Sequence, residues 1–110
     1  MGSYRSRLDI IADILHVVSE GSAKKTQIMY QANLSYKLLT KYLTEVMKVG
    51  LVRLQREERC YVIMSKGVEF LEKYRKYSRS NKHLEKRLND LHSHRKVLED
   101  LCSSRKHGAG

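Results

Sequence analysis

A seven-residue repeat in the last third of the chain limits what this sequence can fold into more than any other feature. A helix is expected from Ser65 to about Cys102, which is much longer than most helices of globular proteins. Its heptad a and d positions are Phe70, Tyr74, Tyr77, Asn81, Leu84, Leu88, Leu91, Arg95, Leu98 and Cys102. All except Asn81 and Arg95 suit burial against another helix. The small domain before this helix cannot cover so long a stripe, so the sequence predicts a coiled coil, with a second copy of the chain as partner.

The two helices of such a homodimer can run parallel or antiparallel. An antiparallel register centred between Leu88 and Leu91 places these two residues opposite each other. The same register pairs Leu84 with Arg95, Asn81 with Leu98 and Tyr77 with Cys102. A parallel pair instead sets Arg95 against its own copy, which is repulsive and poorly solvated. We therefore expect the antiparallel arrangement.

The segment from Asn33 to Gly50 is expected to form one helix with two different faces. Ser35 is a natural N-cap and Gly50 a natural left-handed stop. At 100° per residue the apolar side chains fall on one side and a stripe of lysines and threonines falls on the other. The inward residues are Leu39, Tyr42, Leu43 and Val46, and the outward residues are Lys37, Thr40, Lys41, Thr44 and Lys48. A cationic, hydroxyl-bearing face on a rigid helix is suited to a DNA groove, although a merely solvated face has the same composition.

Two helices are expected before this segment and a β-hairpin after it. Ser6 and Asp9 form a capping-box pattern that opens the first helix, which ends near Gly21. The second helix is expected from about Ser22 or Ala23 to Tyr30. After Gly50 the apolar period changes to about two, over 51–55 and 59–64, with a polar turn of three or four residues between the strands.

The order of these elements predicts a mainly α protein with a small β-hairpin, that is, a winged helix-turn-helix followed by a long coiled-coil helix. The expected parts are a winged helix-turn-helix domain over 4–64, a dimerisation helix over 65–102 and a disordered tail over 103–110.

The charge balance points to a polyanionic partner. The chain has 22 Lys and Arg against 12 Asp and Glu, a net charge of +10. This balance favours nucleic acid ahead of an anionic membrane surface. The excess is spread through the chain, so a basic tail alone does not explain it. No apolar run approaches the roughly 20 residues of a membrane span. Two cysteines, Cys60 and Cys102, form no disulfide framework, so a reducing cytoplasm is the expected compartment.

The candidate DNA contacts lie in three places. The helix over 33–50 offers Ser35, Tyr36, Lys37, Thr40, Lys41 and Thr44. The start of the second helix offers Lys24, Lys25 and Thr26, and the flanks of the hairpin offer Arg53, Arg56 and Arg59. Glu57 and Glu58 at the hairpin tip would repel phosphates, so we expect the 33–50 helix to carry most of the contact. Arg5 and Arg7 are open to two interpretations, a groove contact or a flexible basic terminus.

The run KTQIMYQANLSYKLLTKYL, followed by a short hairpin, Ser65-Lys66-Gly67 and a long heptad helix, resembles the small basic winged-helix proteins of Sulfolobus nucleoids and related archaeal predicted transcriptional regulators. The resemblance covers about residues 6–102. It implies a winged-helix domain joined to an antiparallel coiled-coil homodimer that binds double-stranded DNA with little sequence preference.

The sequence offers no recognisable chemistry. His92 and His94 are two residues apart on a helix and face different ways, and no cysteine pair has ligand spacing, so neither a metal nor a cofactor is expected. No nucleophile stands near a plausible base, and no glycine loop is suited to phosphates, so we do not expect an enzyme.

We expect a homodimeric, nucleoid-associated DNA-binding protein or transcription regulator. A 38-residue helix of about 57 Å would separate two reading helices by more than the roughly 34–36 Å between adjacent major-groove faces, which favours bending or bridging of duplexes. The alternative is a protein–protein interaction module whose basic face is incidental.

Overall fold

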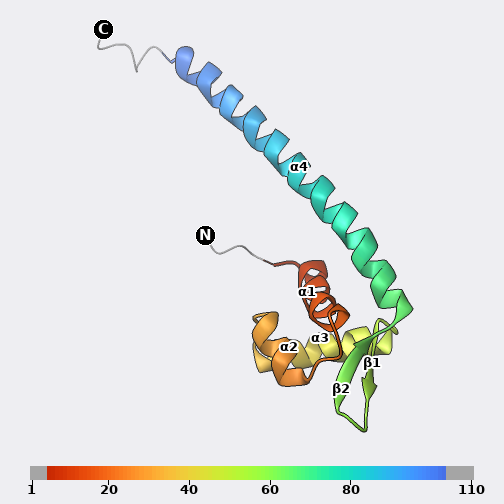
Figure 1. Cartoon of the computed structure of the whole chain (residues 1–110). Helices are drawn as coiled ribbons and strands as arrows, with labels where there is room; N and C mark the ends of the chain where they lie inside the picture. The colour runs from red at the N-terminus through yellow and green to blue at the C-terminus, as the bar shows by residue number, and fades with distance from the viewer. Residues whose placement is uncertain (1–4, 104–110) are drawn as a thin grey trace. The chain divides into compact units, whose positions relative to one another are not determined.

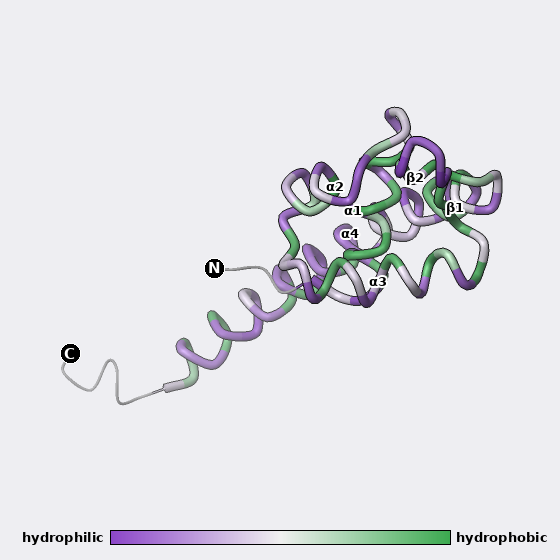
Figure 2. The backbone as a smooth tube through the Cα atoms, turned by 90° about the horizontal axis from the view of Figure 1, so that it is seen from below, coloured by the Kyte–Doolittle hydropathy of each residue, from purple (hydrophilic) through white to green (hydrophobic). Residues whose placement is uncertain are grey.

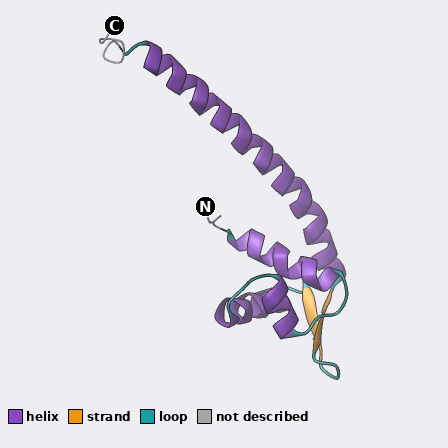
Figure 3. Cartoon of the chain, turned by 60° about the vertical axis from the view of Figure 1, so that its left-hand side comes forward, coloured by secondary structure: helices purple, strands orange, loops and turns teal. Residues whose placement is uncertain are grey.

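The computed structural model describes residues 5–103, which form four helices and one two-stranded sheet (Figure 1). The helices are α1 (Arg7–Ser19), α2 (Lys25–Gln31), α3 (Tyr36–Lys48) and α4 (Ser65–Leu101), and the strands are β1 (Val52–Gln55) and β2 (Cys60–Ile63). Figure 3, coloured by secondary structure, shows that most of the described chain is helical. The predicted mainly α fold with a small β-hairpin and a long C-terminal helix is therefore confirmed. Of the predicted tail, 104–110 lie outside the described residues.

The starts of α1 and α3 are fixed by the side chains that the sequence indicates. Ser6 Oγ accepts a hydrogen bond from the Asp9 amide at 3.2 Å, and Asp9 accepts one from the Ser6 amide at 2.9 Å. This reciprocal pair is a complete capping box. Ser35 Oγ accepts from the Leu38 amide at 3.1 Å and caps α3 by this single bond. Gly50 follows α3 with a φ of 85°, a left-handed conformation that favours glycine.

The core of the first unit is formed by the inner faces of α1, α2 and α3 together with β1. Seven residues of α1 are buried, whereas α2 contributes Ile28 alone. The inward positions predicted for α3 are confirmed, Tyr42 included at 8% exposure. The largest fully buried side chains are Ile14, Leu15, Val18, Ile28, Leu39, Val46 and Val52. Each such side chain stabilises the fold by about 1.5–3 kcal/mol relative to exposure.

The hairpin pairs antiparallel with a regular register from Val52↔Ile63 to Gln55↔Cys60. Four residues, Arg56 to Arg59, form its turn, in agreement with the predicted length. Ala23 adds an isolated bridge to Tyr61, with two backbone hydrogen bonds of 3.1 and 2.8 Å between these residues. Because Ala23 is in extended backbone, α2 begins at Lys25. The predicted start at Ser22 or Ala23 was therefore wrong by two or three residues.

The chain divides into two compact units, Met1–Arg75 and Lys76–Gly110. The first turns of α4 belong to the first unit, since Leu71 is buried in its core and Lys66 Nζ donates to the Val49 carbonyl at 2.8 Å. Gly67 is required in this packing: a Cβ there would overlap the Leu51 carbonyl oxygen and Ile63 Cγ1.

The described part of the second unit, 76–103, is a continuation of α4 and a short turn. Almost all of its side chains are exposed. Coloured by hydropathy, this part of the helix is mostly hydrophilic with isolated apolar positions (Figure 2). Within the described range, 5–103, no helix combines the length and the apolar character needed to cross a membrane.

Candidate nucleic-acid interface

The outward face of α3 carries the lysines and threonines that the sequence places there. Lys37, Lys41 and Thr44 are exposed and Thr40 is half-buried, whereas Leu39 on the opposite side is fully buried. We call Lys37, Thr40, Lys41 and Thr44 the α3 outer face. The structure therefore brings these four predicted site residues together on one side of a well-anchored helix.

Both threonine hydroxyls on this face donate back to the helix backbone. Thr40 Oγ1 donates to the Tyr36 carbonyl and Thr44 Oγ1 to the Thr40 carbonyl, each at 2.9 Å. These bonds fix the orientation of each hydroxyl and leave its oxygen with lone pairs that can still accept a hydrogen bond. Such a face can accept hydrogen bonds from base amino groups and contact thymine methyl groups.

The N-terminal end of α3 is linked to α2 by a cation and an aromatic ring. Lys25 Nζ lies 4.1 Å from the centroid of the Tyr36 ring, and Tyr36 is 64% exposed. The hydrogen bond and positive charge of Lys25 lower the pKa of the Tyr36 hydroxyl below its ordinary value. Tyr36 therefore does not pack into the domain core. Ser35 serves as the cap of α3.

The other predicted residues on α2 are placed differently. Lys24 is the N-cap residue of α2 and makes no side-chain capping bond, and both Lys24 and Thr26 are exposed. With seven residues α2 is short, so the lysine side chains, and not the helix terminus, are the positive groups available there.

The arginines of the hairpin are accessible. Arg53 on β1 is exposed, as are Arg56 and Arg59 in the turn. A surface hollow is lined by Lys25, Leu54, Arg56, Arg59 and Tyr61. The hollow brings Lys25 of α2 beside two arginines of the hairpin. The sequence did not predict this grouping. The two segments are aligned by the Ala23–Tyr61 bridge, and a single bridge produces no periodic pattern in the sequence. Glu57 and Glu58 lie in the same turn and are exposed.

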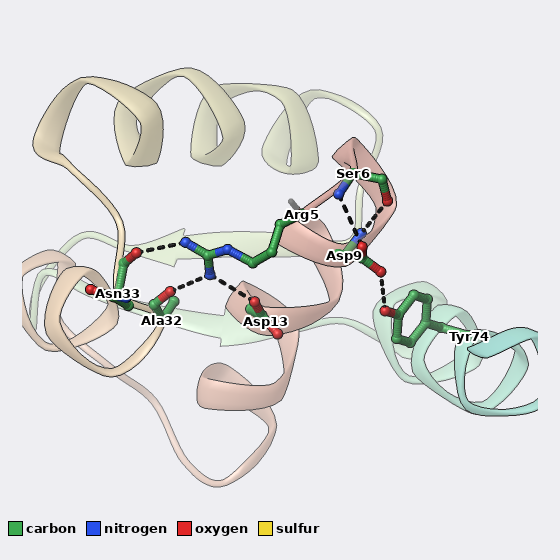
Figure 4. A network of polar contacts seen from close by, with 7 residues as sticks. All are labelled: Arg5, Ser6, Asp9, Asp13, Ala32, Asn33 and Tyr74. Atoms are coloured by element: carbon green, nitrogen blue, oxygen red, sulfur yellow. Dashed lines mark hydrogen bonds and ion pairs between the residues drawn. The ribbon is translucent and has the colours of Figure 1, made fainter. Parts of the chain in front are cut away.

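Arg5 is engaged inside the domain, as Figure 4 shows. Its guanidinium donates to Asp13 at 2.9 Å and to the Ala32 and Asn33 carbonyls at 2.7 Å each. Asn33, with a φ of 55°, forms the left-handed corner of the turn before α3. Arg5 thus ties the α2–α3 turn to α1.

Arg7 is also used within the domain, since it pairs with Glu45 on α3. The side chains of Arg5 and Arg7 both have partners within the domain, so a flexible basic terminus at these two positions disagrees with the structure. Arg5 is held by the turn carbonyls, whereas the Arg7 side chain remains 60% exposed. Sequence reasoning missed the carbonyl partners of Arg5 because they lie 27 and 28 residues away.

The predicted dimerisation positions on α4 are exposed in the single chain. Leu84, Leu88, Leu91 and Leu98 are each 46–63% exposed, and Tyr77, Asn81 and Cys102 are exposed as well. Arg95 makes an ion pair with Glu99 at 3.1 Å, one turn along the same helix. Cys102 lies one residue beyond the end of α4.

The described residues contain no group of three or more His, Cys, Asp or Glu side chains arranged to hold a metal ion.

A family model for winged helix-turn-helix domains matches residues 4–82. The chain belongs to the winged helix-turn-helix family. The match runs through the α1–α2–α3 and hairpin arrangement described above and into the first part of α4. The resemblance in sequence is thereby confirmed at the level of the family.

The known structures and sequences similar to this winged helix-turn-helix chain include archaeal proteins. Sso10a-2, a DNA-binding protein from Sulfolobus solfataricus, has a TM-score of 0.65 at 26% identity, over 79% of this chain and 96% of that one. An uncharacterized protein of Methanocaldococcus jannaschii is 37% identical over 54 residues, which are 49% of this chain and 56% of the relative. This chain thus spans only about half the length of that relative.

A variant of ZitR from Lactococcus lactis has a TM-score of 0.57 at 14% identity, over 100% of this chain and 82% of that one. At this identity the similarity concerns the fold alone.

Proposed function

We propose that this protein binds double-stranded DNA with low sequence specificity, with α3 in the major groove. The observation that carries the proposal is the α3 outer face, a rigid, capped helix with Lys37 and Lys41 free of described carboxylate partners. A duplex groove accepts one helix, and lysines beside it neutralise phosphates. The similarity to Sso10a-2, itself named a DNA-binding protein, supports the same conclusion.

The remaining contacts follow from this placement. Ser35 and Tyr36 lie at the end of α3 that enters the groove in helix-turn-helix proteins. Lys24, Lys25 and Thr26 of α2 and Arg53, Arg56 and Arg59 of the hairpin would contact the backbone on either side. With Glu57 and Glu58 in the hairpin turn, α3 carries more of the affinity than the hairpin does.

The experiment that tests this proposal is duplex binding by the variant K37Q/K41Q. Two lost phosphate contacts should weaken binding at least about tenfold at 0.1 M salt. The matched control is N89D/K96Q on the far part of α4, which lowers the net charge by the same amount. Equal loss in both variants would mean that only net charge matters and would contradict a specific α3 interface.

We further propose that the protein acts as a homodimer through α4. The exposed leucines Leu84, Leu88, Leu91 and Leu98, spaced at heptad positions with Tyr77, Asn81, Arg95 and Cys102, support a coiled coil with a second copy. An exposed apolar row of this kind is costly in a monomer, because its burial is worth roughly 25 cal/mol per Å².

Sedimentation of the variant L88E/L91E tests the homodimer. It should be monomeric at concentrations at which the wild type is dimeric, and an unchanged oligomeric state would contradict the proposal. Orientation is tested by oxidation of Cys102 in a C60S background. The antiparallel arrangement predicts no intradimer disulfide, whereas efficient Cys102–Cys102 crosslinking would establish the parallel one.

A dimer with two DNA-binding domains is suited to a nucleoid-associated architectural protein or a transcription regulator, acting in the cytoplasm on the nucleoid. Since α4 has 37 residues and is about 55 Å long, we favour bending or bridging of duplexes over clamping of a short palindrome. A footprint confined to one straight site of about 20 bp would contradict this. The competing role is a protein–protein interaction module, which predicts no salt-dependent duplex binding at all.

A further inference from the structure

The two halves of α4 beyond Arg75 carry opposite net charge. Between Lys76 and Arg87 there are five Lys and Arg against one acidic residue, Glu85. Between Leu88 and Leu101 there are two basic residues against three acidic ones. Both stretches belong to the same helix and expose most of their side chains. Charged residues that only kept the helix soluble would not need to change the sign of their net charge between the two halves.

Three of the five cations of the first half lie on one side of the helix. Arg79, Lys82 and Lys86 occupy heptad positions f, b and f, on the side opposite the leucine stripe. We call these three residues the stem cluster. They follow one another at intervals of about 4.5–6 Å along the helix axis. Coiled-coil pairing through the a and d positions would leave all three accessible.

The stem cluster has no electrostatic partner in the part of the chain that the structure describes. All three side chains are exposed, and none of them makes an ion pair with a described carboxylate. The far half differs, because Arg95 pairs there with Glu99 one turn away. Like charges one helical turn apart, as at Arg79–Lys82 and Lys82–Lys86, repel each other, and an anionic ligand would relieve that repulsion.

We propose that the stem cluster is a second DNA-binding surface, which contacts the phosphate backbone of a duplex independently of α3. Double-stranded DNA carries a phosphate charge for about every 1.7 Å of its axis, so three cations spaced by one helical turn each meet a phosphate along a groove edge. Glu85 and Asp90 lie within one helical turn of the two lysines, but neither forms an ion pair with them. Exposed lysine and arginine side chains of this kind are suited to phosphate contacts, which position the protein and read no sequence. The inference rests on the proposed function, since it takes the same ligand.

The test is the salt dependence of duplex binding by the full-length variant R79Q/K82Q/K86Q. The slope of log K against log salt should become shallower by about 2–3 per chain, and affinity at 0.1 M salt should fall at least about tenfold. The matched control is N89D/S93D/K96Q, which changes heptad positions b, f and b of the far half and also lowers the net charge by three. It should retain most of the slope. Equal losses in the two triple variants would overturn the proposal, because net charge alone would explain them.

Measurements of helix content and melting temperature check that the variant R79Q/K82Q/K86Q is folded. Removal of three like charges should leave α4 helical and the melting temperature unchanged or higher. The variant K37Q/K41Q separates the two proposals: if it weakens binding and R79Q/K82Q/K86Q does not, the stem cluster is refuted while the α3 interface stands. If the wild type shows no salt-dependent duplex binding, the proposed function itself fails. Binding to anionic phosphatidylserine vesicles that the stem variant abolishes, with DNA binding unchanged, would assign the cluster to membranes and refute it as a DNA site.

Discussion

The winged domain buries most of its apolar side chains in a core of its own, whereas α4 beyond Arg75 leaves its apolar side chains exposed. In the domain, apolar residues such as Leu39 are fully buried, and even an arginine near the surface, Arg5, has three hydrogen bonds. Beyond Arg75 the apolar leucines are about half exposed, and the lysines and arginines near them mostly have no carboxylate partner among the described residues. We therefore expect the domain to be stable by itself, and α4 beyond Arg75 to gain stability from the second copy proposed above.

The largest expected effect separates these two sources of stability. Leu39→Ala removes a fully buried side chain and should lower the free energy of unfolding by about 2–5 kcal/mol at any protein concentration. Leu88→Ala lies on the exposed row and should act through self-association, so its effect on the unfolding midpoint should change with protein concentration. Urea unfolding followed by circular dichroism at two concentrations measures both. If the effect of Leu88→Ala did not depend on protein concentration, Leu88 would not act through self-association, and the proposed difference between the domain and α4 would be contradicted.

A smaller effect is expected from the two arginines at the start of the domain. Arg5→Met retains the apolar stem but breaks the bonds to Asp13 and to the turn carbonyls, and should cost about 1–2 kcal/mol. Arg7→Met breaks an exposed ion pair with Glu45 and should cost less than about 1 kcal/mol. Thermal unfolding of the two variants compares them directly. Equal costs would show that Arg5 makes no special contribution at the α2–α3 turn.

The smallest expected effect concerns pH. Tyr74 on α4 donates to Asp9, and the Ser6 amide donates to it as well; together these bonds hold the pKa of the Asp9 carboxyl below its ordinary value (Figure 4). Because the folded-state pKa lies below the unfolded one, the stabilisation is fully present above the unfolded pKa near 3.8 and is lost as the pH falls through the folded value.

Asp9→Asn should therefore be less stable than the wild type at pH 7, and the difference should shrink below about pH 4. Thermal melts of both proteins from pH 7 to pH 3 measure it. A difference that stays constant with pH would mean that the Asp9 charge contributes nothing. Tyr74→Phe provides the partner variant, since it removes the first of the two donors and should show part of the same pH dependence.

Most of the fold was predictable because its signals are local. Ser6 with Asp9, Ser35 and Gly50 mark helix ends through bonds or backbone angles that depend on a few neighbouring residues, and the change of apolar period at Gly50 marks the hairpin. The α3 outer face was predictable for the same reason, since the angle between successive residues of a helix is fixed.

What the sequence did not reveal depends on contacts between distant segments. The Ala23–Tyr61 bridge is a single pair without periodicity, so it shortened α2 unexpectedly and placed Lys25 near the hairpin arginines. The sequence allowed a groove contact for Arg5 because it does not show which carbonyl groups lie near the guanidinium. In the folded chain these are the carbonyls of Ala32 and Asn33. The sequence also did not show that Gly67 packs against the Leu51 carbonyl. Such a close contact between two backbone segments exists only in the packed structure.

The most direct measurement is the salt dependence of wild-type binding to a duplex of mixed sequence. If Lys37 and Lys41 of α3, together with cations from α2 and the hairpin, contact phosphates, log K should fall against log salt with a slope of about −4 or steeper. A slope near zero, or no binding at about 0.05 M salt, would contradict the claim that this winged helix-turn-helix protein is a DNA-binding protein.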